Sequence, residues 1–241
     1  MKKIIALILS VFSMGMYAAD DIPLRANANA LIEAAERGDS DGCEKLIDAG
    51  VDVNCGLMAK PIHGAARNGH EDCVRFLISK GALVGGGFPA PLSSAALCKR
   101  VSVMRILLEH GARPDNDYQY PACSDIPLHV ATLVNCVPAL ELLKEFGATL
   151  TIQDSNGLSA LHVAMINNSY HAAEWLIKNK LDVNAKAHKS LDLTPLQYAA
   201  TTVALRGDMS CYHLCVKNGA DPTELNEKIG KTAAQLCMMR E

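Results

Sequence analysis

Apolar residues along this chain fall into short clusters separated by polar turns, and the pattern is clearest between Lys60 and Val84. A first cluster runs from Ile62 to Ala66 and a second from Val74 to Ile78, with Asn68-Gly69 between them. Within each cluster the apolar side chains are spaced to share one face of an α-helix. An Asn-Gly pair is typical of a turn. The segment therefore predicts two short antiparallel helices.

The same pattern recurs along the chain, so we expect a solenoid of stacked helix pairs. One apolar position marks each unit, at successive spacings of 31, 30, 36, 33 and 35 residues: Leu31, Ile62, Leu92, Leu128, Leu161 and Leu196. Periods in this range are typical of helical repeats. The expected units lie near residues 28–54, 58–84, 88–115, 124–151, 157–184 and 192–222, and a partial unit over 226–241 caps the array.

Two further positions of each unit support this register. Small residues such as Ala65-Ala66 follow the apolar position, and they let neighbouring helices approach closely. A glycine closes most units, because it tolerates the left-handed backbone that ends a helix; Lys180 takes its place in the fifth unit. Residues near 115–124 and 201–209 exceed the repeat length and predict two lengthened loops.

With this register the chain resembles the ankyrin repeat family. The resemblance runs from about Ala28 to Met239, and its motifs are Pro127-Leu128-His129, Ala160-Leu161-His162, Thr194-Pro195-Leu196, Val53-Asn54 and Val183-Asn184. It implies an all-α solenoid of about six repeats with a partial C-terminal cap. Hairpin loops, here called fingers, are expected to project before each first helix. It also implies that the protein binds other proteins and is not an enzyme.

The resemblance implies a concave binding groove built from the fingers and from the two variable residues after each small pair. In the middle units Leu97, Leu133 and Ile166 occupy this position, so we expect an apolar strip with a polar rim, as in a protein interface. The alternative is that these three pack against each other or beneath a finger. The predicted contact residues are Leu57, Met58, Arg67, Asn68, Phe88, Leu97, Tyr118, Tyr120, Leu133, Val134, Asn156, Leu158, Ile166, Leu191 and Thr201.

The N-terminus is typical of a secretory signal peptide. Lys2 and Lys3 precede an apolar run over residues 4–12, and Ala18-Ala19 offers a cleavage site. The run is shorter than the roughly 20 apolar residues of a membrane span. Cleavage after residue 18 or 19 would leave a repeat domain over 20–241, with no membrane contact, and removing both lysines changes the net charge from −3 to −5. A mildly acidic chain without a basic block argues against nucleic acid as a partner.

All of the cysteines follow the predicted cleavage site, and an oxidising compartment permits disulfides. They are nine in number: Cys43, Cys55, Cys73, Cys98, Cys123, Cys136, Cys211, Cys215 and Cys237. Cys98 and Cys136 are expected near the ends of first helices in adjacent units, with Cys123 in the finger between them. We predict one bridge, between Cys98 and Cys136 or using Cys123; the alternative is three thiols.

No residue pattern in the chain predicts a metal, a cofactor or catalysis. His63, His129 and His162 share one repeat position, where the family resemblance implies a structural role in tying loops between units. On one helix, Cys211 and Cys215 lie on a different face from the histidine between them, so a zinc site is not expected. We therefore predict a binding protein without a cofactor.

The leading hypothesis is a periplasmic binding protein of a Gram-negative bacterium, monomeric when free. The chain looks like exported bacterial ankyrin proteins, and we expect an immunity protein that binds and inhibits a secreted enzyme toxin through its groove. Two alternatives stay open at this point. The partner is a periplasmic stress enzyme such as catalase, or the chain is a secreted effector directed at host proteins.

Overall fold

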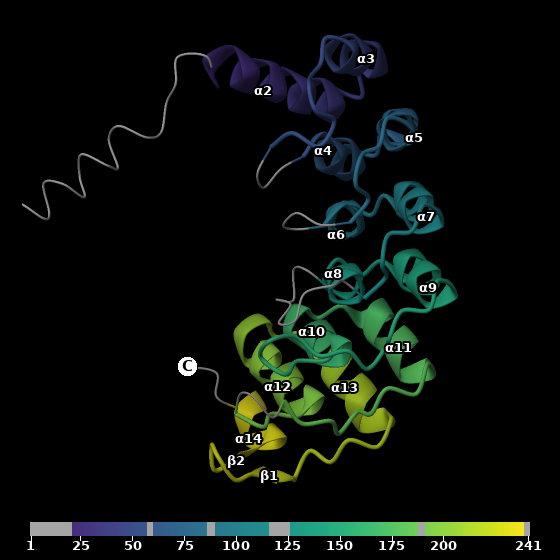
Figure 1. Ribbon diagram of the computed structural model, residues 1–241. Coiled ribbons are helices and arrows are strands. Elements are labelled where there is room, and N and C mark those ends of the chain that lie inside the picture. Colours follow the sequence, from purple (N-terminus) through teal and green to yellow (C-terminus); the bar gives the residue numbers. More distant parts are fainter. Residues whose placement is uncertain (1–20, 57–59, 86–89, 116–125, 188–190, 239–241) are drawn as a thin grey trace, which may run out of the picture.

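The chain forms a curved array of helix pairs in the computed structural model, which confirms the predicted all-α solenoid (Figure 1). The structure describes residues 21–56, 60–85, 90–115, 126–187 and 191–238. The predicted signal peptide over residues 1–18 lies outside these ranges. Within them, no helix combines the length and apolar character needed to cross a membrane.

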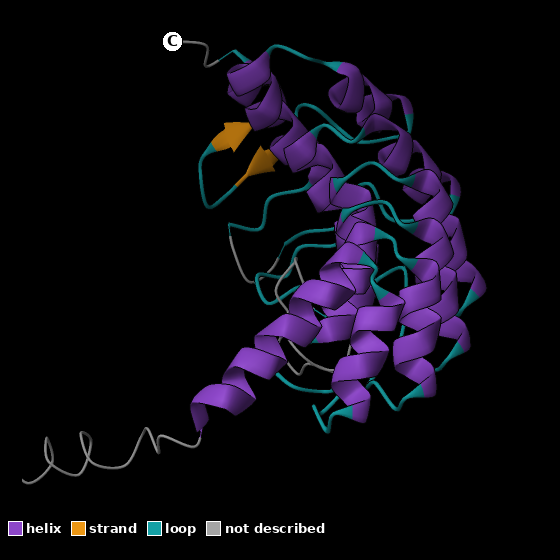
Figure 2. Ribbon diagram, turned by 90° about the horizontal axis from the view of Figure 1, so that it is seen from above, coloured by secondary structure: helices purple, strands orange, loops and turns teal. Residues whose placement is uncertain are grey.

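Each repeat contributes a first helix and a second helix, and the two kinds form separate layers. The first helices are α2 (Asp21–Arg37), α4 (Pro61–Asn68), α6 (Pro91–Leu97), α8 (Pro127–Leu133), α10 (Ala160–Asn167) and α12 (Pro195–Arg206). The second helices are α3 (Ser40–Asp48), α5 (Glu71–Ser79), α7 (Val101–Glu109), α9 (Val137–Glu145), α11 (Tyr170–Lys178) and α13 (Ser210–Lys217). Figure 2 shows the second helices along the outer side of the curve and the connecting loops on the inner side.

Local sequence fixes where the first helices begin. Proline occupies the first turn of α4, α6, α8 and α12, where a missing N–H costs nothing because that turn has no internal acceptor. In α12 a capping box adds to this: Gln197 N–H donates to Thr194 Oγ1 at 3.3 Å, and Thr194 N–H donates to Gln197 Oε1 at 3.0 Å. The first helices therefore start directly behind the fingers.

The apolar marker of each unit forms the centre of one continuous core. Leu31, Ile62, Leu92, Leu128, Leu161 and Leu196 are at most 2% exposed. Their helices pack in sequence, α2 on α4 through to α10 on α12. Buried alanines lie between neighbouring helices and allow this close approach. Burying one such leucine contributes about 2 kcal/mol. Each unit thus depends on its neighbours for most of its burial.

Histidines at the repeated position tie the fingers to the first helices. His162 is fully buried; its Nε2–H donates to the carbonyls of Ala185 at 3.1 Å and Leu193 at 3.2 Å. Its Nδ1 accepts from Ser159 Oγ at 2.8 Å and from the Ser159 backbone N–H at 3.1 Å. His129 Nε2–H donates to the Ile152 carbonyl at 3.1 Å in the same way. These bonds hold one repeat to the loop that leads into the next.

His129 is held in its neutral form. It is fully buried, and burial lowers its pKa to about 4 although the bond to Ile152 opposes the shift. Among the described residues its Nδ1 has no hydrogen-bond partner; the helix cap before it is Ile126, which lacks the hydroxyl that Ser159 supplies in the next repeat. Protonating His129 would therefore bury a charged ring whose one hydrogen-bond acceptor among the described residues is the Ile152 carbonyl.

The C-terminal cap contains a small β-hairpin that the sequence pattern did not predict. Strands β1 (Leu225–Asn226) and β2 (Lys231–Thr232) pair antiparallel, and α14 (Ala233–Cys237) follows and packs on α12. Buried Asn226 donates to the carbonyls of Leu191 and Asp192, both at 3.1 Å. The hairpin is thereby tied to the segment that leads into α12.

Two boundaries differ from the predicted ones. Residues 201–209 were expected as a lengthened loop, but α12 continues helically to Arg206 and ends at Gly207, which has a positive φ of 79°. The expectation was wrong because Thr201 to Arg206 contain no helix-breaking residue. At the other end, α2 begins at Asp21, ahead of the first predicted unit. The second predicted long loop falls almost entirely outside the described residues.

Second helices end in a left-handed residue, as expected from the repeated glycine. Gly147 has a φ of 83°, and Lys180 adopts the same region with a φ of 68°. A side chain in this region costs about 1–2 kcal/mol relative to glycine. An added Cβ at Gly147 meets no atom within 4 Å. Any loss of stability on replacing Gly147 by alanine therefore comes from the left-handed backbone and not from a steric clash.

We predict opposite stability changes for two reciprocal substitutions at this position. Lys180→Gly should raise the free energy of unfolding by about 1 kcal/mol, and Gly147→Ala should lower it by about 1 kcal/mol, because only the left-handed strain changes. Urea unfolding followed by circular dichroism measures both. Two changes of the same sign would contradict this assignment.

We also predict that acidification destabilises the chain through His129. Its pKa is lower folded than unfolded, so the stability present above pH 6.5 is lost as the pH falls towards 4, by about 3 kcal/mol. Urea unfolding across this range measures the loss. His129→Gln keeps a neutral donor towards the Ile152 carbonyl, and it should flatten the pH dependence. An equally steep curve in the variant would show that another group causes it.

Candidate protein-binding surface

Three apolar side chains lie at the C-terminal ends of successive first helices. Leu97 ends α6, Leu133 ends α8 and Ile166 is the penultimate residue of α10; we call this set the inner strip. Leu97 is 49% exposed and Leu133 is 40% exposed, while Ile166 is half-buried. Since α6, α8 and α10 pack side by side, the strip crosses three repeats. Among the described residues, no loop therefore covers the two leucines fully.

Polar groups border the inner strip at its N-terminal side. Arg67 is exposed, and its carbonyl accepts a bond from Arg100 Nε at 3.3 Å. Asn68 donates through Nδ2 to the Glu36 carbonyl at 2.7 Å. At the other side Thr201 is half-buried and donates to the Tyr198 carbonyl at 2.7 Å. Arg67 and Asn68 thus join neighbouring repeats, whereas the bond of Thr201 stays within α12.

The finger of the fifth repeat is held by one buried carboxylate. Asp154 is 2% exposed, and its Oδ1 accepts the backbone N–H groups of Asn156 at 2.9 Å and Leu158 at 2.8 Å. A bridge between Gln153 and Ser159 closes the hairpin. Asn156 is exposed and Leu158 is half-buried. The loop therefore presents both predicted contact residues from a fixed turn.

The remaining predicted contact residues divide into two groups. Leu191 is 49% exposed, whereas Val134 is half-buried and packs against the core. The others lie outside the described residues: Leu57, Met58, Phe88, Tyr118 and Tyr120. The inner strip is thus the part of the predicted surface that the structure describes best.

Sequence reasoning missed an apolar extension of this surface. The additional turn of α12 carries Leu205, which is 85% exposed, and Met209 follows it at 38%. Thr202, one turn earlier, donates through Oγ1 to the carbonyls of Met165 at 3.1 Å and Ile166 at 3.4 Å. The turn therefore continues from the end of the inner strip. The uninterrupted helix-forming run before Gly207 was the available signal.

Two residue pairs with the composition of a reactive site have structural roles. Ser159 and His162 are 2.8 Å apart but at most 8% exposed, and both histidine nitrogens are engaged. Burial raises the pKa of Cys211 and of Cys215 to about 12, so both stay protonated at neutral pH. Among the described side chains, no cluster of three or more metal-binding residues occurs.

The predicted bridge between Cys98 and Cys136 is not formed, and both are free thiols in the structure. The sequence placed both near the ends of first helices. Cys98 does cap the C-terminus of α6, but Cys136 is buried as the N-cap of the second helix α9. The alternative partner, Cys123, lies outside the described residues.

Comparison with known proteins identifies similar sequences over most of the chain. The family model described as ankyrin repeats (3 copies) matches residues 31–118 and 115–187. Ankyrin repeat and SOCS box protein 11 of Mus musculus is 34% identical over 119 residues, which cover 48% of this chain and 36% of that protein. Ankyrin repeat protein nuc-2 of Neurospora crassa is 28% identical over 217 residues, covering 87% of this chain and 19% of its own length.

Solved structures show the same fold. The crystal structure of the human ASB11 ankyrin repeat domain aligns with a TM-score of 0.71 and 24% identity, over 88% of this chain and 97% of that domain. The chain spans about a third of the length of the first curated relatives, whose shared part is 36% of the protein. Ankyrin repeats serve as scaffolds for binding other proteins. From the matched model and the stacked helix pairs, this chain belongs to the ankyrin repeat family.

Proposed function

We propose that this chain is an exported immunity protein that holds a secreted enzyme toxin against the inner strip and blocks its active site. The main support for this binding surface is the exposure of Leu97 and Leu133 on helices that pack side by side. Covering the exposed half of each leucine contributes about 1 kcal/mol. A partner with aromatic anchors placed on the strip would supply the rest.

The dimensions of the strip favour a protein as the ligand. Packed helices lie about 8–10 Å apart, so three first helices carry the strip over roughly 20 Å. That length exceeds most small molecules and matches a few turns of helix or a short strand. The chain has a net charge of −3, which disfavours nucleic acid.

Export is the part of the proposal that rests on sequence. Lys2 and Lys3, the apolar run over 4–12 and Ala18-Ala19 follow the order of a signal peptide. A protein in the periplasm that binds one partner tightly suits the neutralisation of a toxin delivered there. The inhibitor would act by plugging the substrate cleft of the enzyme.

We predict that charges on the inner strip abolish partner binding. A Leu97→Glu and Leu133→Glu double variant should bind the captured partner at least about 30-fold more weakly, equal to about 2 kcal/mol, because two carboxylates would be desolvated. Both side chains are exposed, so the fold should persist. Affinity capture from periplasmic extract identifies the partner, and titration of the purified pair measures the affinity.

Val216→Glu is the matched control for this experiment. Val216 is 37% exposed on α13, the second helix of the sixth repeat, so this variant adds one carboxylate to the outer layer and is compared with each single leucine variant as well as with the double variant. The control should bind like the unmodified chain. Equal loss in both variants, or loss in neither, would reject the inner strip. Capture of a partner that is not an inhibited enzyme would reject the immunity role and leave the surface intact.

A further inference from the structure

Two buried thiols meet between the first and second repeats. Cys43 lies on α3 and Cys73 on α5, two second helices that pack side by side. Cys43 is 0% exposed and Cys73 is 1% exposed. Their side chains are in hydrogen-bond contact, with Cys43 donating to Cys73. Both are free thiols in the structure.

Packing alone does not require sulfur at either position. The residues equivalent to Cys73 are Val103 in the third unit and Ala139 in the fourth. The residues equivalent to Cys43 are Val74 in the second unit and Met104 in the third. All four are buried. Ordinary apolar side chains therefore fill the same space elsewhere in the array. The first interface differs by placing a thiol on each side.

The two thiols are chemically unequal. The hydrogen bond from Cys43 and one from Ser40 lower the pKa of Cys73, although burial opposes this shift. The same contact with Cys73, together with burial, raises the pKa of Cys43. Cys73 is therefore the thiol that ionises first. A thiolate is the reactive form of cysteine.

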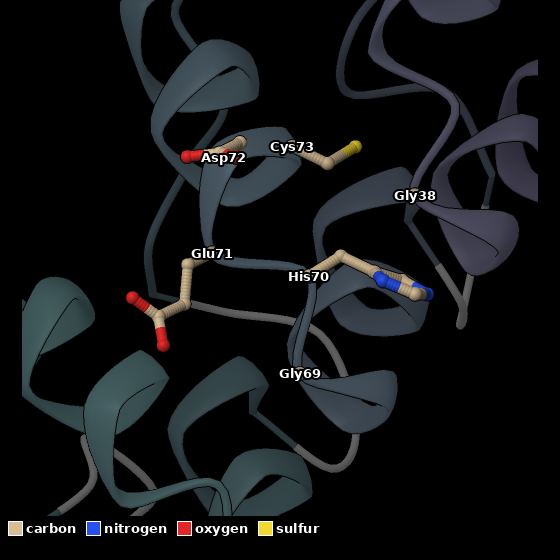
Figure 3. Close-up of a pocket in the computed structure, with 6 residues that line it drawn as sticks. All are labelled: Gly38, Gly69, His70, Glu71, Asp72 and Cys73. Carbon is tan, nitrogen blue, oxygen red and sulfur yellow. The ribbon is translucent and has the colours of Figure 1, made fainter.

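A surface pocket of about 390 Å³ reaches Cys73 (Figure 3). It is lined by Gly38, Gly69, His70, Glu71, Asp72 and Cys73. Figure 3 shows the Cys73 sulfur pointing towards the Gly38 segment of the first repeat, whereas the Glu71 and Asp72 carboxylates point in other directions. Because Cys73 is buried, a small uncharged oxidant such as hydrogen peroxide would reach its sulfur from the pocket during local opening of the first repeat.

We propose that Cys43 and Cys73 form a peroxide-driven disulfide that clamps the first repeat to the second. The Cys73 thiolate attacks one peroxide oxygen, the O–O bond breaks, and hydroxide leaves a sulfenic acid on Cys73. Cys43 sulfur then attacks Cys73 sulfur; the S–O bond breaks and the leaving hydroxide takes the Cys43 proton as water. Two thiols lose two electrons and two protons, and one peroxide becomes two waters.

The bridge would act at the first repeat of the described array. A terminal repeat has a neighbour on one side only, so it opens more readily than an internal one. Joining Cys43 to Cys73 closes a loop of 30 residues (73 − 43) and restricts the unfolded chain. Oxidation should therefore raise the thermal stability of the first repeat. This inference is independent of the proposed partner and of export.

Treating the folded, reduced full chain with hydrogen peroxide tests the proposal. Peptide mapping by mass spectrometry under non-reducing conditions should recover the segments containing Cys43 and Cys73 as one linked species. The melting temperature should rise by about 5 °C or more. A reductant should reverse both changes. Cys43 and Cys73 recovered unlinked, or as separate sulfinic acids, would overturn the proposal.

Two variants separate the bridge from other effects of peroxide. Cys43→Ala removes one thiol, so peroxide should no longer raise its melting temperature. Cys211→Ala is the matched control, because Cys211 is equally buried and occupies the position of Cys73 in the sixth unit. It should keep both the linked species and the stabilisation. A peroxide-dependent rise in Cys43→Ala would also contradict the proposed bridge.

Discussion

Close stacking of the first helices is the interaction on which the rest of the structure depends. Each unit is too small to bury its own apolar face, so its marker leucine or isoleucine is covered by the units on either side. Buried alanine pairs such as Ala65-Ala66 and Ala95-Ala96 allow this approach. Because the stacking sets the register, the residue that ends each first helix lies beside its equivalent in the next unit. The inner strip follows directly from that register.

Polar contacts between repeats then fix the loops that border the strip. His162 holds two carbonyls of the following finger, and Asp154 holds the turn of its own finger. On the outer layer, Arg105 donates two hydrogen bonds of 2.9 Å to Glu145 in the next repeat. This ion pair is exposed, so it contributes little to the stability of the fold. Specific loop geometry therefore comes mainly from the buried groups. The exposed strip is presented by a rigid scaffold, which suits a binding surface.

The repeat register, the core and the helix starts could be predicted from the sequence, because each depends on a pattern that recurs. Features that occur once could not be predicted in the same way. The extra turn of α12 replaces an expected loop, and the β-hairpin of the cap depends on Asn226 reaching Leu191 and Asp192 in space. The contact between Cys43 and Cys73 was missed for a related reason: the two residues are one position out of register with each other, and only the packing of α3 on α5 brings them together.

We propose that the C-terminal ends of α6, α8 and α10, which carry the inner strip, hold another protein. Hydrogen–deuterium exchange of the chain, free and bound to its captured partner, tests this claim most directly. We expect added protection at the ends of α6, α8 and α10, with the outer helices α5, α7 and α9 unchanged. Protection confined to the outer helices, with the ends of α6, α8 and α10 exchanging as in the free chain, would contradict it.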